Sequence, residues 1–227
     1  MARGLQKAVI AGGSDALSLL TFTGFNSLKV VDPLPCSPFS LGRQGISLGE
    51  GAAFFVLESE KDAQARGVRI YGRVLGYALA GEAYHMTAPE PSGASAARVM
   101  GDAISSAGIH VDQVGWVNAH GTGTPLNDVV ESTAMNLLFG ERAPRVPLVS
   151  TKAMTGHCLG AAGAIEALAT VLALNNRIIP QTLNFRGRDP ECPLDYCHDG
   201  CRTTDARVAL SNSFAFGGNV TCLVLGL

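Results

Sequence analysis

The sequence predicts an α/β protein, and three observations support this prediction. From about residue 70 onward, short apolar segments rich in β-forming residues alternate with segments of helix length. Apolar residues make up 47% of the 227-residue chain and charged residues 16%, a composition that can fill a core between strands and covering helices. Gly-rich segments follow several of the predicted strands. The length allows one large domain or two small ones, because a domain typically holds about 100 to 200 residues.

Seven short segments have the composition of strands. The first of them has the character of an interior strand although six residues precede it, which predicts that the sequence begins inside a fold. Segments 81–93 and 180–206 are rich in proline, glycine and polar residues and are expected to be loops. The predicted strands are 7–11, 51–58, 70–80, 115–119, 147–151, 207–211 and 221–225.

Three segments are predicted to form the main helices. The first, 94–107, has apolar residues on one face and ends before Gly108, which suits a left-handed C-cap. The second runs from 127 or 128 to 140, where an asparagine or an aspartate can act as the N-cap. The third, 156–175, contains mainly small and apolar residues, so it is expected to be enclosed on most sides.

The charge balance excludes two classes of partner. Seventeen basic and nineteen acidic side chains give a net charge of −2, which offers no basic surface to nucleic acid or to an anionic membrane. The longest charge-poor stretch, 158–174, contains Glu166 and many small residues, so it is predicted to be a buried helix rather than a membrane span. The N-terminus lacks the apolar segment of an export signal, which predicts a cytoplasmic protein.

The six cysteines are expected to be free thiols, because disulfides are rare in a reducing compartment. Cys192, Cys197, His198 and Cys201 lie close together in the sequence and could be taken for zinc ligands. Their C-x4-C-H-x2-C spacing lacks the paired motifs of zinc sites, so loop composition is the simpler explanation.

Three segments carry the side chains that are capable of chemistry, and each follows a predicted strand. Open α/β sheets bind ligands at the carboxyl ends of their strands, so His120 is expected at that edge of the sheet. The glycines at 121–123 and 217–218 allow a ligand to approach the backbone, or they form tight turns, and no Walker or dinucleotide-binding spacing is present. The three segments are 118–125 (NAHGTGTP), 150–157 (STKAMTGH) and 212–219 (NSFAFGGN).

His157 is expected in the first turn of the third helix, where the positive end of the helix dipole disfavours an imidazolium. A neutral imidazole there can donate a hydrogen bond to a developing oxyanion or enolate. Lys152 and Glu166 complete the polar set, although His120 could also be purely structural and Lys152 and Glu166 could form only a structural ion pair. A pair of Cys158 with His157 is not expected, because neighbours on a helix point about 100° apart.

Together these segments resemble the β-ketoacyl-acyl carrier protein synthases of the synthase I/II type and their polyketide relatives. The AGG turn near 11–15 and the GEGA strand at 48–57 complete the resemblance, which covers essentially the whole chain in order. It implies the thiolase fold, an α/β fold whose two similar halves each contain a five-stranded mixed sheet with helices. Residues 1–65 would then form the tail of the N-terminal half, and residues 66–227 the complete C-terminal half.

The resemblance implies a decarboxylative Claisen condensation in fatty acid or polyketide biosynthesis, with no metal or organic cofactor. An acyl chain on an active-site cysteine is attacked by the carbanion that a malonyl thioester forms when it loses carbon dioxide. The implied partner is an acyl carrier protein with phosphopantetheine-linked acyl and malonyl groups. The implied assembly is a homodimer or a ketosynthase heterodimer.

Five residues match the family's catalytic positions. His120 and His157 match the two histidines that bind the malonyl thioester carbonyl and stabilise the enolate. Lys152 matches the buried lysine, and Glu166 matches the glutamate that pairs with it. Phe216 matches the gating phenylalanine whose backbone N–H helps to form the oxyanion hole.

Other positions match residues that bind or support. Thr122 and Thr124 match the threonines that hold the phosphopantetheine arm. Asp128 and Glu131 match acidic residues for which a structural role is expected, and Lys29 lies where relatives have a basic residue that docks the carrier protein.

The sequence also departs from the family pattern. The nucleophilic cysteine of the family lies upstream of the AGG turn, and none of the six cysteines here occupies that position. Ala215 replaces a common glycine, and 217–220 lacks the usual threonine-asparagine pair. We therefore expect the 227-residue chain alone to lack condensing activity and to aggregate through unpaired strands.

Two alternative functions remain open. The chain could belong to a chain-length-factor-like or otherwise inactive partner subunit, or it could be a scaffold with no activity of its own. The presence of His120, His157 and Lys152 together favours the active class, because a partner that does no chemistry has no need of that polar set.

Overall fold

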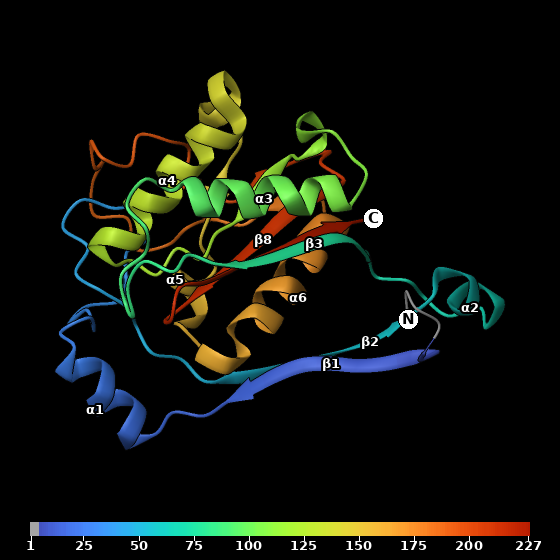
Figure 1. Ribbon diagram of the computed structural model, residues 1–227, viewed down its shortest axis with the longest axis horizontal. Helices are drawn as coiled ribbons and strands as arrows, with labels where there is room; N and C mark the ends of the chain where they lie inside the picture. Colours follow the sequence, from blue (N-terminus) through green and yellow to red (C-terminus); the bar gives the residue numbers. More distant parts are fainter. Residues whose placement is uncertain (1–4) are drawn as a thin grey trace.

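The computed structural model describes residues 5–227, and it has the predicted α/β architecture (Figure 1). A five-stranded mixed sheet forms its centre. Antiparallel pairing joins the first three strands in spatial order, and parallel pairing joins the last three. In that order the strands are β3 (Arg73–Gly81), β9 (Asn219–Gly226), β8 (Val208–Ala215), β4 (Trp116–Asn118) and β5 (Leu148–Val149).

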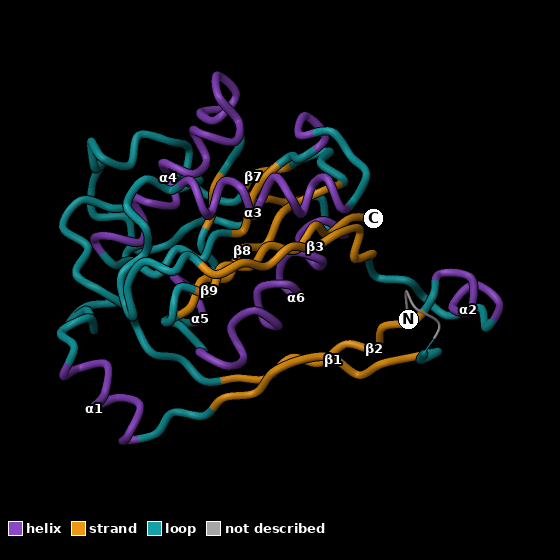
Figure 2. The backbone as a smooth tube through the Cα atoms, in the orientation of Figure 1, coloured by secondary structure: helices purple, strands orange, loops and turns teal. Residues whose placement is uncertain are grey.

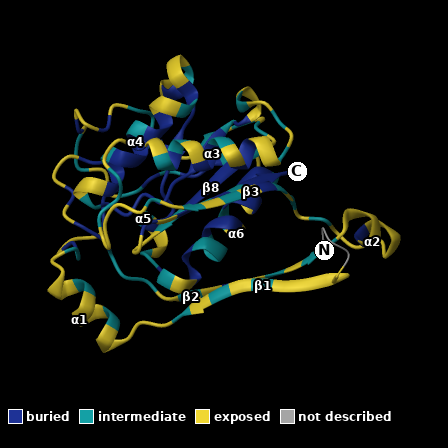
Figure 3. Ribbon diagram, in the orientation of Figure 1, coloured by how far each residue is buried: buried dark blue, intermediate teal, exposed yellow. Residues whose placement is uncertain are grey.

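Helices cover both faces of this sheet, and the buried residues concentrate between the layers (Figures 1 and 3). On one face lie α3 (Ala94–Ser106) and α4 (Pro125–Phe139), whose apolar side chains join those of the strands in the largest core cluster. On the other face lies α6 (Ala162–Asn175), which packs on β8 and β9.

A two-stranded antiparallel sheet, β1 (Ala8–Asp15) and β2 (Gly51–Glu58), lies on the far side of α6 (Figure 1). Because α6 contacts both sheets, it is enclosed between them. The outer side of this ribbon is apolar: Ile10, Phe54 and Val56 are 74%, 63% and 67% exposed. The prediction of a strand at the start of the chain is therefore confirmed, but most of β1 is exposed in this structure.

The longer loops gather at the end of the molecule opposite the two chain termini (Figure 2). Several short elements in other parts of the chain were not predicted, because they are brief or lie in polar segments. These are α1 (Leu19–Ser27), α2 (Glu60–Ala65), α5 (Lys152–Thr155), β6 (Ile178–Ile179) and β7 (Arg202–Thr203). No helix in the part of the chain that the structure describes is long and apolar enough to cross a membrane.

Some predicted boundaries agree closely with the structure, and others are wrong. The helix expected at 94–107 is α3, and Gly108 has the expected left-handed backbone with φ of +65°. The helix expected from 127 or 128 begins at Pro125, because proline fits the first helical position, which needs no N–H donor.

The predicted third helix, 156–175, begins later than expected. Gly156 has φ of +70° and an extended ψ of 177°, which ends α5, and His157 is extended. A 3-10 turn, Leu159–Ala161, then leads directly into α6, which begins at Ala162. The strand expected at 207–211 continues to Ala215 as β8, so the first half of the supposed Gly-rich loop 212–219 is strand.

Candidate active site

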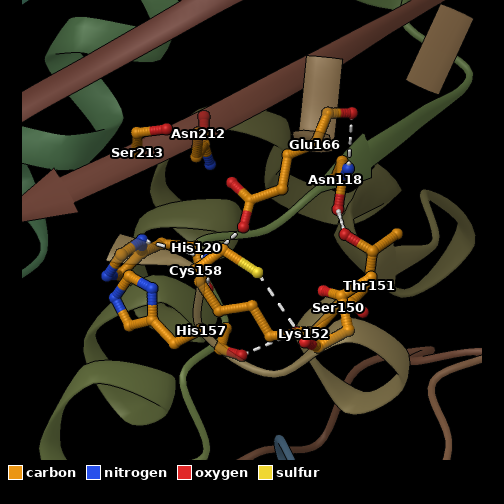
Figure 4. A network of polar contacts seen from close by, with 12 residues as sticks. Asn118, His120, Ser150, Thr151, Lys152, His157, Cys158, Glu166, Asn212 and Ser213 are labelled. Atoms are coloured by element: carbon orange, nitrogen blue, oxygen red, sulfur yellow. Dashed lines mark hydrogen bonds and ion pairs between the residues drawn. The ribbon is translucent and has the colours of Figure 1, made fainter. Parts of the chain in front are cut away.

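His120 and His157 face one cavity near the end of the central sheet (Figure 4). His120 follows β4, and His157 lies in the extended segment between α5 and α6. The centroids of the two rings are 5.4 Å apart, and the ring planes are nearly perpendicular, at 83°. The cavity has a volume of about 160 Å³, and its other lining residues are Leu159, Ala162, Gly163, Ser213, Phe214, Ala215, Asn219 and Thr221.

His157 is held by backbone pairing rather than by a helix. Its N–H donates to the carbonyl of Ser47 at 2.7 Å, and its carbonyl accepts from the N–H of Gly49 at 3.1 Å. The expectation that His157 lies in the first turn of the long helix is wrong, because α6 begins only at Ala162. His157 lies just before the 3-10 turn Leu159–Ala161 that leads into α6, and the first N–H of that turn donates to its Nδ1.

Both imidazoles are nevertheless kept neutral, and the cause is burial together with neighbouring charge. Burial, followed by the positive charge of Lys152, lowers the pKa of His157 to about 3. Burial lowers the pKa of His120 well below its ordinary value, with Lys152 and His157 adding to the effect. At neutral pH the cavity thus contains two uncharged imidazoles.

The donors that lie next to the Nδ1 atoms favour one tautomer of each ring. The backbone N–H of Leu159 donates to Nδ1 of His157 at 3.2 Å. The ammonium of Lys152, which can only donate, lies 3.4 Å from Nδ1 of His120. A ring nitrogen that accepts a hydrogen bond carries no proton, so each neutral ring carries its proton on Nε2 and can donate it to a ligand.

Lys152 and Glu166 form a buried ion pair, with 1% and 2% of each residue exposed (Figure 4). The Lys152 ammonium also donates to the backbone carbonyl of His120 at 2.5 Å, so the pair is in direct contact with the histidine site. Burial raises the pKa of Glu166, and Lys152 opposes the rise only in part. Oε2 of this carboxyl group is buried and has no hydrogen-bond partner among the described residues.

Asn118 supports the ion pair, a role that was not predicted from the sequence. Its side-chain amide donates to the backbone carbonyl of Glu166 and to the hydroxyl of Thr170, both at 3.1 Å. Its position as the last residue of β4 was the available signal, because side chains at strand ends meet at this edge of the sheet.

Glu131 fixes the backbone around His120. Its fully buried carboxylate accepts hydrogen bonds from the N–H groups of His120 and Gly121, both at 2.8 Å, and from the amide of Asn212 at 3.1 Å. Burial raises the pKa of Glu131 to about 7, against the effect of these three donors.

Thr122 and Thr124 lie side by side in the loop between β4 and α4. Their hydroxyl oxygens are 2.9 Å apart and share a hydrogen bond. Asp128 holds this loop, because its carboxylate accepts from the N–H of Gly123 at 3.2 Å and from the N–H of Phe39 at 2.7 Å. The structure thus brings the two predicted binding residues together in the loop that follows His120, and neither is among the residues that line the cavity.

The two phenylalanines that follow Asn212 have different surroundings. Phe216 lies in the turn between β8 and β9, is 48% exposed and stacks on Phe25 of α1 with centroids 5.9 Å apart. Phe214 lines the cavity, and its ring centroid lies 5.4 Å from that of His120. This position of Phe214 was not predicted, although the residue lies within the segment 212–219.

The cysteines do not assemble into a further site. All six are free thiols. Cys158 is buried with a raised pKa, and its thiol donates to the backbone carbonyls of Thr155 and Gly156. His198, in the suspected zinc segment, stacks on Phe185 at 4.0 Å, and the described part of the chain contains no group of three or more potential ligands placed to hold a metal.

Comparison with known proteins identifies the relatives of this chain. The family model for "Beta-ketoacyl synthase, C-terminal domain" matches residues 71–186, and the family model for "Beta-ketoacyl synthase, N-terminal domain" matches residues 1–63. The chain is 45% identical to 3-oxoacyl-[acyl-carrier-protein] synthase 2 of Synechocystis sp. over 226 residues, which cover 96% of the chain and 54% of the relative. The 3-oxoacyl-[acyl-carrier-protein] synthase 2 of Staphylococcus aureus is 42% identical, over 98% of this chain and 57% of the relative. The chain therefore spans about half the length of these relatives.

Solved structures give the same result. A β-ketoacyl synthase from Burkholderia phymatum superposes with a TM-score of 0.94 at 38% identity, over 99% of this chain and 56% of that one. A type II polyketide ketosynthase in complex with its acyl-carrier protein superposes with a TM-score of 0.96 at 35% identity, over 99% of this chain and 57% of that one. A ketosynthase in complex with its chain length factor from Xenorhabdus doucetiae superposes with a TM-score of 0.88 at 40% identity, over 100% of this chain and 54% of that one. The predicted thiolase-like α/β fold is thereby confirmed.

Proposed function

Because this chain belongs to the β-ketoacyl synthase family, we propose that it forms the malonyl-binding part of a β-ketoacyl-acyl carrier protein synthase. That enzyme catalyses the decarboxylative Claisen condensation of a malonyl thioester with an acyl-enzyme in fatty acid or polyketide biosynthesis. The observation that carries the proposal is the pair of neutral imidazoles, His120 and His157, which share one cavity and keep their Nε2 protons available.

The chemistry follows from the charge that develops on the substrate. When the malonyl carboxylate leaves as carbon dioxide, its bonding electrons form an enolate, and negative charge develops on the thioester oxygen. Two Nε2–H groups in a buried cavity stabilise that charge without transferring a proton. Removing one such donor costs about 2.7 to 4 kcal/mol, a hundred- to thousandfold loss in rate.

The remaining residues have supporting roles in this proposal. Lys152 keeps the histidines neutral and fixes the tautomer of His120, and Glu166 balances its charge. Phe216 acts as the gate for the acyl chain, and the hydroxyls of Thr122 and Thr124 hold the phosphopantetheine arm. No cysteine is among the residues that line the cavity, so the acyl-carrying nucleophile is not assigned to any of the six cysteines.

The proposal extends to partners and organisation. An acyl carrier protein delivers the thioesters, and the synthase acts as a homodimer or a ketosynthase heterodimer in the cytoplasm. Similar structures of a ketosynthase with its carrier protein and of another with its chain length factor support these partners. Residues 1–65 belong to the N-terminal half and residues 66–227 to the C-terminal half, a division supported by the separate matches of the two domain descriptions.

The test is the release of carbon dioxide from malonyl-pantetheine by the protein that contains this chain. We expect His120→Ala and His157→Ala each to slow decarboxylation by about a hundred- to thousandfold, because each removes one donor. The matched control is His110→Ala, since the His110 side chain is 75% exposed and lies outside the cavity. Near-normal decarboxylation by either cavity variant would remove that histidine from the role. A wild-type protein without decarboxylation would favour the chain-length-factor-like alternative.

A further inference from the structure

Arg43 is a buried arginine that the proposed chemistry does not use. Its side chain is only 4% exposed, although it lies in the long connection between α1 and β2. Its Nε donates to the carbonyl of Thr124 at 3.2 Å, and its Nη2 donates to the carbonyl of Pro125 at 3.0 Å. Nη1 donates to the carbonyl of Ser40 at 3.0 Å and to the carboxylate of Asp189.

The two carbonyls bound by Nε and Nη2 lie where the threonine loop becomes α4. Thr124 is the N-cap of that helix, and Pro125 is its first residue. Asp128 lies 3.5 Å from Nε of Arg43 and accepts from the N–H of Gly123. The guanidinium of Arg43 therefore binds carbonyl groups at the end of the loop, and the carboxylate of Asp128 binds an N–H group within it.

The charge environment excludes a direct contact of Arg43 with a phosphate. Asp128 and Asp189 both contact the guanidinium, and both are buried. An arginine whose charge is balanced by two buried carboxylates, and whose N–H groups point at backbone carbonyls, acts on the backbone rather than on a ligand.

We propose that Arg43 is a positioning residue that holds the hydroxyls of Thr122 and Thr124 in the orientation that binds the phosphopantetheine arm. This inference rests on the proposed function, because the role of the two threonines does. The two hydroxyls share one hydrogen bond, so only one of their protons is free for a ligand. A rotation of the peptide group that follows Thr124 would reorient the two hydroxyls and change which of their atoms can bond a ligand. The hydrogen bonds from Arg43 to the carbonyls of Thr124 and Pro125 prevent this rotation.

The chain offers a matched control in Arg186. It donates to the carboxylate of Asp32 at 3.0 Å and to the carbonyl of Pro35 at 2.7 Å. Like Arg43, it joins the α1–β2 connection to the segment after β6. Its hydrogen bonds do not extend to Thr124 or Pro125, so its loss loosens the same connection without releasing the threonine loop.

The experiment compares Arg43→Met with Arg186→Met in the protein that contains this chain. The first readout is the ratio of kcat/KM for malonyl-pantetheine to kcat/KM for the S-ethyl thioester of malonate, which lacks the pantetheine amides. We expect Arg43→Met to lower this ratio about tenfold, the loss of one well-placed hydrogen bond, mainly through KM for the pantetheine substrate. Arg186→Met should keep the wild-type ratio. An unchanged ratio in Arg43→Met, or an equal fall in Arg186→Met, would overturn the inference.

The second readout separates this inference from the proposed function. Binding of free pantetheine, measured by calorimetric titration, requires no decarboxylation, and we expect Arg43→Met to weaken it about tenfold. If the wild type binds pantetheine but releases no carbon dioxide, the proposed function fails and the binding comparison still decides the role of Arg43. If Arg43→Met does not fold, Arg43→Lys takes its place, because one ammonium keeps the charge but cannot bond both carbonyls in the same way. Wild-type affinity in Arg43→Lys would then overturn the inference.

Discussion

Removing one member of the Lys152–Glu166 ion pair should destabilise the protein far more than removing both. Lys152→Met leaves the carboxylate of Glu166 buried without a counter-charge, and its Oε2 already has no partner among the described residues. Breaking a buried pair in this way costs about 3 to 5 kcal/mol. The double variant Lys152→Met/Glu166→Gln carries neither buried charge, so its free energy of unfolding should lie within about 2 kcal/mol of the wild type.

The cost should also depend on pH, in a direction that the structure determines. The folded-state pKa of Glu166 lies above its ordinary value because of burial, and loss of Lys152 raises it further. The penalty for the charged carboxylate is present above that pKa and is relieved as the pH falls through it. Lys152→Met should therefore be less destabilised at about pH 5 than at about pH 8.

Urea unfolding of the wild type, the two single variants and the double variant measures this coupling. The exposed pair of Arg98 and Asp102 on α3, four residues apart, is the control, because such pairs contribute about 0.3 to 0.5 kcal/mol. Additive losses at Lys152 and Glu166, or single losses no larger than that control, would refute the reasoning. The double variant should fold and yet decarboxylate slowly, since Lys152 also contacts His120.

Three further predictions concern residues on the elements around the cavity. Burial raises the pKa of Glu131 from 4.5 to about 7, so the free energy of unfolding should fall by about 3 kcal/mol as the pH rises from 4.5 to 7. Urea titrations at several pH values measure this fall, and Glu131→Gln should not show it. Gly123→Ala should lower the unfolding midpoint more than Gly108→Ala, because both have positive φ but only at Gly123 would a Cβ lie 2.8 Å from a backbone oxygen. Phe214→Ala should impair decarboxylation, because its ring packs on His120. Phe216→Ala should mainly change which acyl chains load onto the enzyme. The reverse pattern in acyl-loading and decarboxylation assays would contradict both assignments.

The elements that the sequence predicts well are those whose signals are local. Helix α3 has a continuous apolar face and a glycine in the left-handed region just after its end, and β2 has an uninterrupted apolar run with the predicted bounds. The late start of α6 was not predictable from periodicity, because the residues between Gly156 and Ala162 are mainly small and apolar, like those of the helix itself. Its cause is the pairing of His157 with the chain near Leu48, a contact between residues far apart in the sequence.

The candidate site divides in the same way. His120 and the segment from Asn212 follow predicted strands, so both could be placed at one edge of the sheet from topology alone. The neutral state of His157 was also predicted, but from a helix dipole, whereas burial and Lys152 produce it. The role of Arg43 could not be predicted, because its contacts at Thr124 and Asp189 are distant in sequence and only the folded loops bring them together.

The central claim is that two neutral imidazoles present Nε2–H donors to the cavity. Nitrogen NMR of the protein with ¹⁵N-labelled histidine rings tests it directly, with His120→Ala and His157→Ala used to assign the signals. We predict that both rings carry their proton on Nε2 and none on Nδ1 from about pH 5 to pH 8, since burial and Lys152 lower both pKa values. A ring that titrates near the ordinary histidine value, about 6.5, or that carries its proton on Nδ1, would contradict the claim.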